Sequence, residues 1–263
     1  ACHYLMELPQ NPDATDQRLA ELLKNVDAIE DAAPENPTKV EEVIIEVAKR
    51  NPAPGEFLTA FARRLETRRK FVLAETLYQQ AIRVMPQLSE PKTQLGMLYM
   101  QTGRTTEAKQ ILDDAFSADP YHVRVSNMRK VLGVLGGYDK ITTDHFVIHV
   151  DSKEDRILGE YMAEYLEEVY TELVKHYGYE PPQRTNFEIY NKAKGQTAHQ
   201  WFSARMVGLP WIQTIGASTG MMVALASPTA TNQPYNWARV VKHEFVHVVT
   251  LQQTRFNIPH WFT

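Results

Sequence analysis

Two histidines and a glutamate near the end of the chain stand in the order His243-Glu244-Phe245-Val246-His247. Residues four apart lie on one face of a helix, so both imidazoles are close enough to bind a single Zn²⁺ at about 2.0–2.1 Å. Glu244 is rotated by one residue and stands beside the metal without ligating it. Bound Zn²⁺ lowers the pKa of its water from about 15.7 toward roughly 7, and Glu244 can accept the released proton. The spacing therefore predicts zinc-activated water with Glu244 as general base.

The surrounding residues indicate that this helix lies in a core. Three fixed positions also occur on surface helices with two unrelated histidines, so the pattern needs support from its context. Its other faces are apolar and carry Trp237, Val240, Val241, Phe245, Val248 and Val249. A buried polar cluster needs partners, and a metal ion is one. We predict a helix that begins near Pro234, runs to about residue 253 and has the HExxH arrangement of zinc metallopeptidases.

The first half of the chain repeats itself every 34 residues. The matching pairs are Ala74 with Ala108, Tyr78 with Leu112, Ala81 with Ala115 and Pro86 with Pro120. This period, with small residues where helices touch and a closing proline, resembles the tetratricopeptide pattern. It predicts helical repeats over residues 1–137: clear repeats at 55–88 and 89–122, a degenerate one at 17–54 and a capping helix at 121–135. A structural spacer and a concave groove that binds a peptide are both compatible with so few repeats.

The second half mixes strands and helices. Residues 141–150 alternate between apolar and polar side chains and are predicted to form a strand, and residues 187–190 and 221–226 form two more. Ser152 and Asp155 are predicted to make a capping box for a helix that runs to Tyr177 and ends at Gly178. Gly136-Gly137 breaks the helical half, so the boundary is placed near residues 136–139. We expect an α+β protein, with an all-α domain at 1–137 and a mixed domain at 138–263.

From residue 141 to the end, the chain resembles the peptidase-MA-like gluzincins, which are zinc peptidases of the thermolysin fold. The resemblance rests on the strand segments 144–148 and 187–190, on residues 207–210 and 221–228, on the HExxH segment 243–247, and on the terminal Pro-x-Trp-Phe-Thr at 259–263. It implies the upper lobe of such a peptidase, with His243 and His247 as zinc ligands and Glu244 as the base. Tetratricopeptide repeats ahead of such a domain are a familiar arrangement.

The resemblance also implies where substrate and a third ligand belong. An edge strand beside the zinc would pair with an extended substrate through its main chain, which we expect at Met222, Val223 and Ala224, although the apolar run also suits a core strand. In the family, a Glu directly after Trp-Phe-Ser/Thr is the third ligand. The sequence stops at Thr263, before that position, so we expect the 263-residue chain to hold zinc weakly and to be inactive. His260 is expected to be a solvent-exposed loop residue.

The amino-acid composition limits the kinds of partner and site that are expected for this chain. The net charge is −4 and neither half is basic, which argues against nucleic acid as a partner, and no run approaches the about 20 apolar residues of a membrane span. Cys2 is the only cysteine, so a thiolate zinc site and an internal disulfide are excluded. The start Ala1-Cys2-His3 indicates a chain cut from a longer one. A removed signal peptide, and with it an extracytoplasmic location, stays open.

Three functions are compatible with these patterns. The first is a zinc metallopeptidase, with a peptide or protein as substrate and with repeats that recruit or position a protein partner. The second is a non-catalytic interaction scaffold with a vestigial peptidase lobe. An intact Glu244 favours the enzyme, because a scaffold has no need of that carboxylate. The third is a metal-dependent hydrolase of another bond type, because HExxH specifies activated water and not its target.

Overall fold

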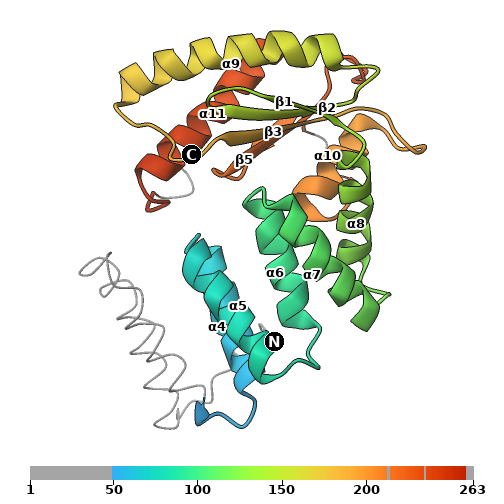
Figure 1. The fold of residues 1–263 in the computed structure, drawn as a ribbon, viewed down its shortest axis with the longest axis vertical. Helices are drawn as coiled ribbons and strands as arrows, with labels where there is room; N and C mark the ends of the chain where they lie inside the picture. The colour runs from blue at the N-terminus through green and yellow to red at the C-terminus, as the bar shows by residue number, and fades with distance from the viewer. Residues whose placement is uncertain (1–48, 212–213, 234, 259–263) are drawn as a thin grey trace. The chain divides into compact units, whose positions relative to one another are not determined.

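The computed structural model describes residues 49–211, 214–233 and 235–258 (Figure 1). The chain divides into two compact units after Leu95, within helix α6 (Glu90–Gln101). The predicted boundary near residues 136–139 lies much later, because helix α8 (Val123–Leu135) packs against α10 (Ala198–Val207) of the second half. Nearly all of the predicted degenerate repeat at 17–54 lies outside the described residues.

The described part of the first unit is built around the helix pair α4 (Pro54–Thr67) and α5 (Phe71–Val84). Its interior is apolar and consists of Leu58, Phe61, Ala62, Leu65, Leu73, Ala74, Leu77 and Ala81, with the ring of Tyr78. The hydroxyl of Tyr78 donates to a carboxylate oxygen of Glu66 at 2.7 Å. Burial raises the pKa of Glu66 above its ordinary value, more than this hydrogen bond lowers it.

The C-terminal ends of the helices show the same spacing as the sequence repeat. Helices α4 and α5 each end 34 residues before their counterparts, α6 and α7 (Thr105–Ala118). The small residues of the pattern are buried, including Ala74, Ala81, Ala108 and Ala115. A side chain at Gly96 would overlap Leu112, so glycine permits the approach of α6 and α7. Two helix pairs with this spacing are therefore present, as the period predicted.

A five-stranded mixed sheet forms the centre of the second unit (Figure 1). Its order is β1-β2-β3-β5-β4, with bounds β1 (Asp139–Thr142), β2 (Phe146–Val150), β3 (Thr185–Tyr190), β4 (Gly216–Ser218) and β5 (Met222–Ala226). Strands β2, β3 and β5 are parallel, and the outer strands β1 and β4 are antiparallel to their neighbours. The α+β fold class is thus confirmed at this coarse level.

Helices cover both faces of the sheet. Helix α9 (Arg156–Tyr177) packs against β1 and β2, and α11 (Trp237–Gln253) packs against β4, β5 and α9. Helix α10 contacts β3 and β5 from the other face and also packs against α8. Because successive strand residues point to opposite faces, Phe187 and Ile189 face α9 and α11, whereas Glu188 and Tyr190 face α10.

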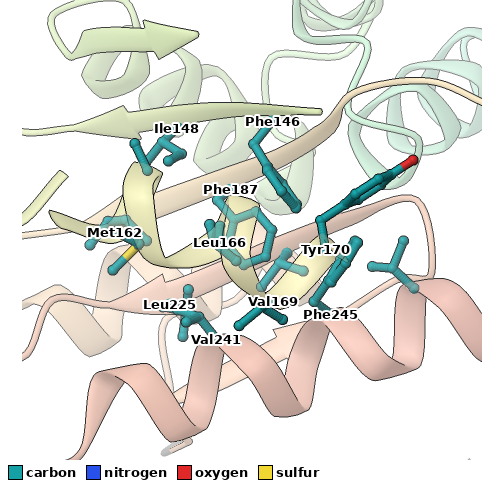
Figure 2. Packing of buried hydrophobic residues seen from close by; sticks show 14 of the residues in the cluster. Phe146, Ile148, Met162, Leu166, Val169, Tyr170, Phe187, Leu225, Val241 and Phe245 are labelled. Atoms are coloured by element: carbon teal, nitrogen blue, oxygen red, sulfur yellow. The ribbon is translucent and has the colours of Figure 1, made fainter. Parts of the chain in front are cut away.

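The core between the sheet and α9 with α11 is rich in aromatic rings (Figure 2). The ring of Phe245 lies with its centroid 5.0 Å from that of Phe146, in an edge-to-face arrangement. Phe187 and Tyr170 stand around the same pair. Rings in such arrangements contribute about 0.5–1.5 kcal/mol per pair beyond the area they bury. This packing fixes α11 on the sheet.

Two details of the predicted elements are wrong. Residues 141–150 form a hairpin of β1 and β2 and not a single strand, because the chain turns at Thr143 to His145. The capping box does not form: Asp155 is the N-cap residue of α9, but its side chain makes no cap hydrogen bond. Asp155 instead accepts hydrogen bonds from Ser227 and Thr229 at 2.8 Å. The predicted end of α9 at Gly178, in the left-handed conformation, is confirmed.

Candidate metal centre

Helix α11 presents the predicted residues of the metal centre. It begins at Trp237, three residues after Pro234, and the side chain of its N-cap residue Asn236 accepts from the backbone N–H of Arg239 at 3.0 Å. It ends at Gln253, as predicted. A capped first turn satisfies one of the unpaired N–H groups at the helix start.

One face of α11 is buried and the opposite face is polar. Val241, Phe245, Val248 and Val249 are fully buried in the core. Partly exposed Lys242 donates to both carboxylate oxygens of Glu172 on α9 at 2.7 Å, and Gln252 donates to the carbonyl of Gly220 at 2.8 Å. The helix is therefore held along its length, and His243 and His247 stand on a fixed frame.

His243 and His247 bring their ring nitrogens together. Their Nε2 atoms are 3.1 Å apart, and the two ring planes are nearly perpendicular. Two nitrogen ligands of one tetrahedral ion, each at 2.0–2.1 Å, are separated by about 3.3 Å. Burial and then the neighbouring His243 lower the pKa of His247, which favours the neutral imidazole that binds metals. The spacing of this donor pair fits a zinc ion.

Glu244 is a buried acid beside this pair. Its side chain is 7% exposed, and burial raises its pKa to about 7. Within the described part of the chain, no hydrogen bond or ion pair reaches its carboxyl group. A carboxyl group with this pKa is half-ionised near neutrality, which suits a group that accepts and returns a proton.

The strand nearest Glu244 is β4 and not β5. A Cβ at Gly216 of β4 would lie 3.4 Å from Oε1 of Glu244 and 3.2 Å from Val240 on α11. Strand β5 pairs with β3 on one side and with β4 on the other, and all five of its residues are buried. The substrate-pairing role predicted for Met222, Val223 and Ala224 is therefore corrected: their main chain is already paired, and among the described residues β4 is the edge strand on this side of the sheet.

Among the described residues, His145 and His176 make contacts with groups other than this pair. His145 contacts a carboxylate oxygen of Glu167 at 2.6 Å and stacks on the ring of Tyr170, and His176 packs edge-on against Tyr177. In residues 49–211, 214–233 and 235–258, no three His, Cys, Asp or Glu side chains gather as metal ligands would. His260 lies outside these ranges, as does the predicted position of the third ligand beyond Thr263.

A second polar cluster lies on the α10 side of the sheet and was not foreseen from the sequence. Arg205 donates to both oxygens of Glu188 at 2.5 and 3.0 Å, and Tyr190 donates to Glu188 at 2.8 Å. All three side chains are fully buried. Neither Arg205 nor Glu188 belongs to a recognisable motif in the sequence. Their positions do not indicate which partner lies across the fold.

Comparisons with protein-family models, with curated proteins and with solved structures found no match. No helix among the described residues is long and apolar enough to cross a membrane. The case for a function therefore rests on the metal centre itself.

Proposed function

We propose that this chain carries the metal-binding lobe of a zinc metallopeptidase that hydrolyses peptide bonds. One observation carries the proposal: the Nε2 atoms of His243 and His247 lie 3.1 Å apart on the helix that also carries Glu244, a buried acid whose pKa lies at about 7. A structural helix gains nothing from burying most of a carboxyl group without a counter-ion or hydrogen bond.

The side chains of this proposed site have distinct roles. His243 and His247 hold Zn²⁺ through Nε2, and the resemblance places a third ligand, a Glu, beyond Thr263. When bound, the ion lowers the pKa of a water molecule and polarises the substrate carbonyl. Glu244 accepts the proton of the attacking water on its carboxylate and returns it to the nitrogen of the leaving amine. Its raised pKa serves both transfers, because it is close to the working pH.

Strand β4 is the part of the sheet on which an extended substrate is expected to pair. Gly216, Ala217 and Ser218 pair with β5 on one side only, so the other edge of their main chain is free within the sheet. Such an edge binds a peptide through backbone hydrogen bonds. Because Gly216 adjoins Glu244, a peptide paired there would bring a carbonyl group close to the base. The helix pairs before the sheet would recruit or position a protein substrate or partner.

Zinc binding provides the first test. His243→Ala and His247→Ala are expected to lower zinc affinity, measured by calorimetric titration, in the 263-residue chain and in one that continues into the next lobe. The His176→Ala variant is a matched control, since His176 is an exposed histidine at the end of α9. The longer chain should bind zinc more tightly than the 263-residue chain. Unchanged zinc affinity in both helix variants would overturn the proposed site.

Hydrolysis provides the second test. In the longer chain, Glu244→Gln keeps the shape of the side chain and removes the base, so peptide cleavage should fall by a factor on the order of 10²–10⁴ while zinc stays bound. The exposed Glu160 on α9 serves as control through Glu160→Gln. Near-normal turnover in Glu244→Gln would exclude this base. No turnover in the unmodified longer chain, despite tight zinc binding, would favour the non-catalytic scaffold.

A further inference from the structure

The C-terminal end of helix α6 is bound by side chains from the sheet region. Arg205 donates to the carbonyl of Met100 at 2.8 Å, and Thr219 donates to the carbonyl of Gln101 at 2.8 Å. The last carbonyls of a helix have no partner within it, and a cation near them is favourable. Two consecutive carbonyls of α6 thus accept hydrogen bonds from α10 and from the loop between β4 and β5, and that of Met100 also accepts from the backbone N–H of Gly103 at 3.2 Å.

The contact at this helix end is close. Gly103, which follows α6, has φ of +77°, and a Cβ there would lie 2.9 Å from Nδ2 of Asn186 on β3 and 3.5 Å from Cβ of Met222 on β5. Arg205 is anchored in turn by the buried Glu188. The end of α6 therefore has little room to move relative to β3 and β5.

Thr219 is the side chain through which this contact reaches the edge strand. Its hydroxyl oxygen accepts from the backbone N–H groups of Met221 at 3.2 Å and Met222 at 3.1 Å, while its hydrogen goes to Gln101. Thr219 directly follows Ser218, the last residue of β4. One hydroxyl therefore shapes the turn between β4 and β5 and fastens it to α6.

Strand β4 depends on such anchors because it is short. It has three residues, and among the described residues it pairs with β5 alone. Its other support is α11, which it meets at Val240 and Glu244 next to Gly216. A displacement of β4 would shift Gly216 relative to Glu244 and would move the backbone edge with which a peptide is expected to pair.

We infer that the end of α6 holds β4 in place beside Glu244 and that Thr219 is the positioning residue through which it does so. The functional meaning of this inference rests on the proposed peptidase function, in which β4 is the strand that pairs with substrate. The last helix pair is then a part of the substrate-binding surface, and not only a spacer or a docking arm.

Amide hydrogen exchange of the 263-residue chain, followed by mass spectrometry, tests this inference. In Thr219→Val, which removes the hydroxyl and keeps the shape, exchange in peptides covering residues 216–222 should rise about tenfold or more, with core peptides of α9 unchanged. Thr219→Ser restores the hydroxyl and should return exchange to within about twofold of the unmodified chain. Thr106→Val, an exposed change on α7, is the matched control.

A second variant separates the helix end from the turn. Gly103→Ala forces a side chain against Asn186 and should displace the end of α6, so exchange in residues 216–222 should rise although the substitution is more than 100 residues away. If Thr219→Val or Gly103→Ala leaves residues 216–222 unchanged, or raises exchange equally everywhere, α6 does not position β4. Neither measurement uses metal or turnover, so failure here leaves the role of Glu244 untouched, and loss of that role leaves these results untouched.

Discussion

Two buried glutamates on opposite faces of the same sheet have opposite surroundings. Glu188 on β3 faces α10, where Arg205 and Tyr190 donate three hydrogen bonds to it. Glu244 on α11 lies beside β4, among described residues that offer no counter-ion, and burial raises its pKa to about 7. The first arrangement keeps a charge in place. The second keeps a proton available near neutral pH.

The difference shows how surroundings separate structural from chemical carboxylates. A buried charge is tolerated when a partner and hydrogen bonds compensate it, and removal of one partner is costly. A buried acid without a partner stays neutral to higher pH, which costs stability above that pH but makes the group useful for proton transfer. Burial of Glu188 therefore predicts a stability defect on substitution, and burial of Glu244 predicts a pH-dependent one.

The largest expected effect follows from breaking the Glu188 cluster. Arg205→Met leaves Glu188 buried without its charged partner and removes one of the two hydrogen bonds to the Met100 carbonyl, so the free energy of unfolding should fall by about 3–5 kcal/mol in urea titration. The double variant Arg205→Met with Glu188→Leu removes both charges and should lose less than the single variant. A double variant that loses the sum of both single changes would show that the pair is not coupled.

The next effect concerns Glu244 and has a definite sign. Its pKa is about 7 in the folded chain against 4.5 as the ordinary value, so the folded state holds a proton that the unfolded state releases between these pH values. Its contribution to stability is fully present below pH 4.5 and is lost as the pH rises to about 7. The shift sets an upper bound of about 3 kcal/mol for this change.

Glu244→Gln isolates this contribution. The difference in free energy of unfolding between the unmodified chain and the variant, measured with a metal chelator, should favour the variant increasingly from pH 4.5 to pH 8. Exposed Glu160→Gln should show no comparable trend. A difference that stays constant over this range would mean that the carboxyl group is solvated in the folded chain and would remove the physical basis for its role as base.

Periodic features of the sequence predicted much of the fold. The 34-residue spacing indicated the helix pairs, because small residues must recur where helices touch, and Gly178 marked the end of α9. The helix that carries His243 and His247 was predicted to end at about residue 253, and its last residue is Gln253. In each case the signal lies within the element itself or repeats along the chain, so a local pattern carries it.

Features that depend on distant partners were not predicted. Strand β4 has only three residues, too few for any alternation, so β5 was mistaken for the edge. Asp155 has the sequence position of a capping residue, but its carboxylate instead accepts a hydrogen bond from Ser227, 72 residues later. The pairing of Arg205 with Glu188 joins a helix to a strand in the fold, and no regular spacing of residues along the sequence indicates it.

The smallest expected effect concerns a partly exposed ion pair, which is compared with the buried pair of Arg205 and Glu188. Arg129 on α8 donates to Asp113 on α7 at 2.6 Å, and this hydrogen bond is the main reason that the pKa of Asp113 lies below its ordinary 3.8. More than a third of each side chain is exposed, so solvent screens the pair. Asp113→Asn should therefore lower the free energy of unfolding by less than about 1 kcal/mol at pH 7 and low salt.

The contribution of this pair to stability also depends on pH and salt. Because the pKa of Asp113 is depressed in the folded chain, this contribution is present above pH 3.8 and is lost as the pH falls below it, and 1 M salt should also weaken it. Urea titrations at pH 7 and pH 3, with and without salt, measure these differences. A loss of several kcal/mol would mean that this pair behaves like the buried pair of Arg205 and Glu188, and that burial is not what separates them.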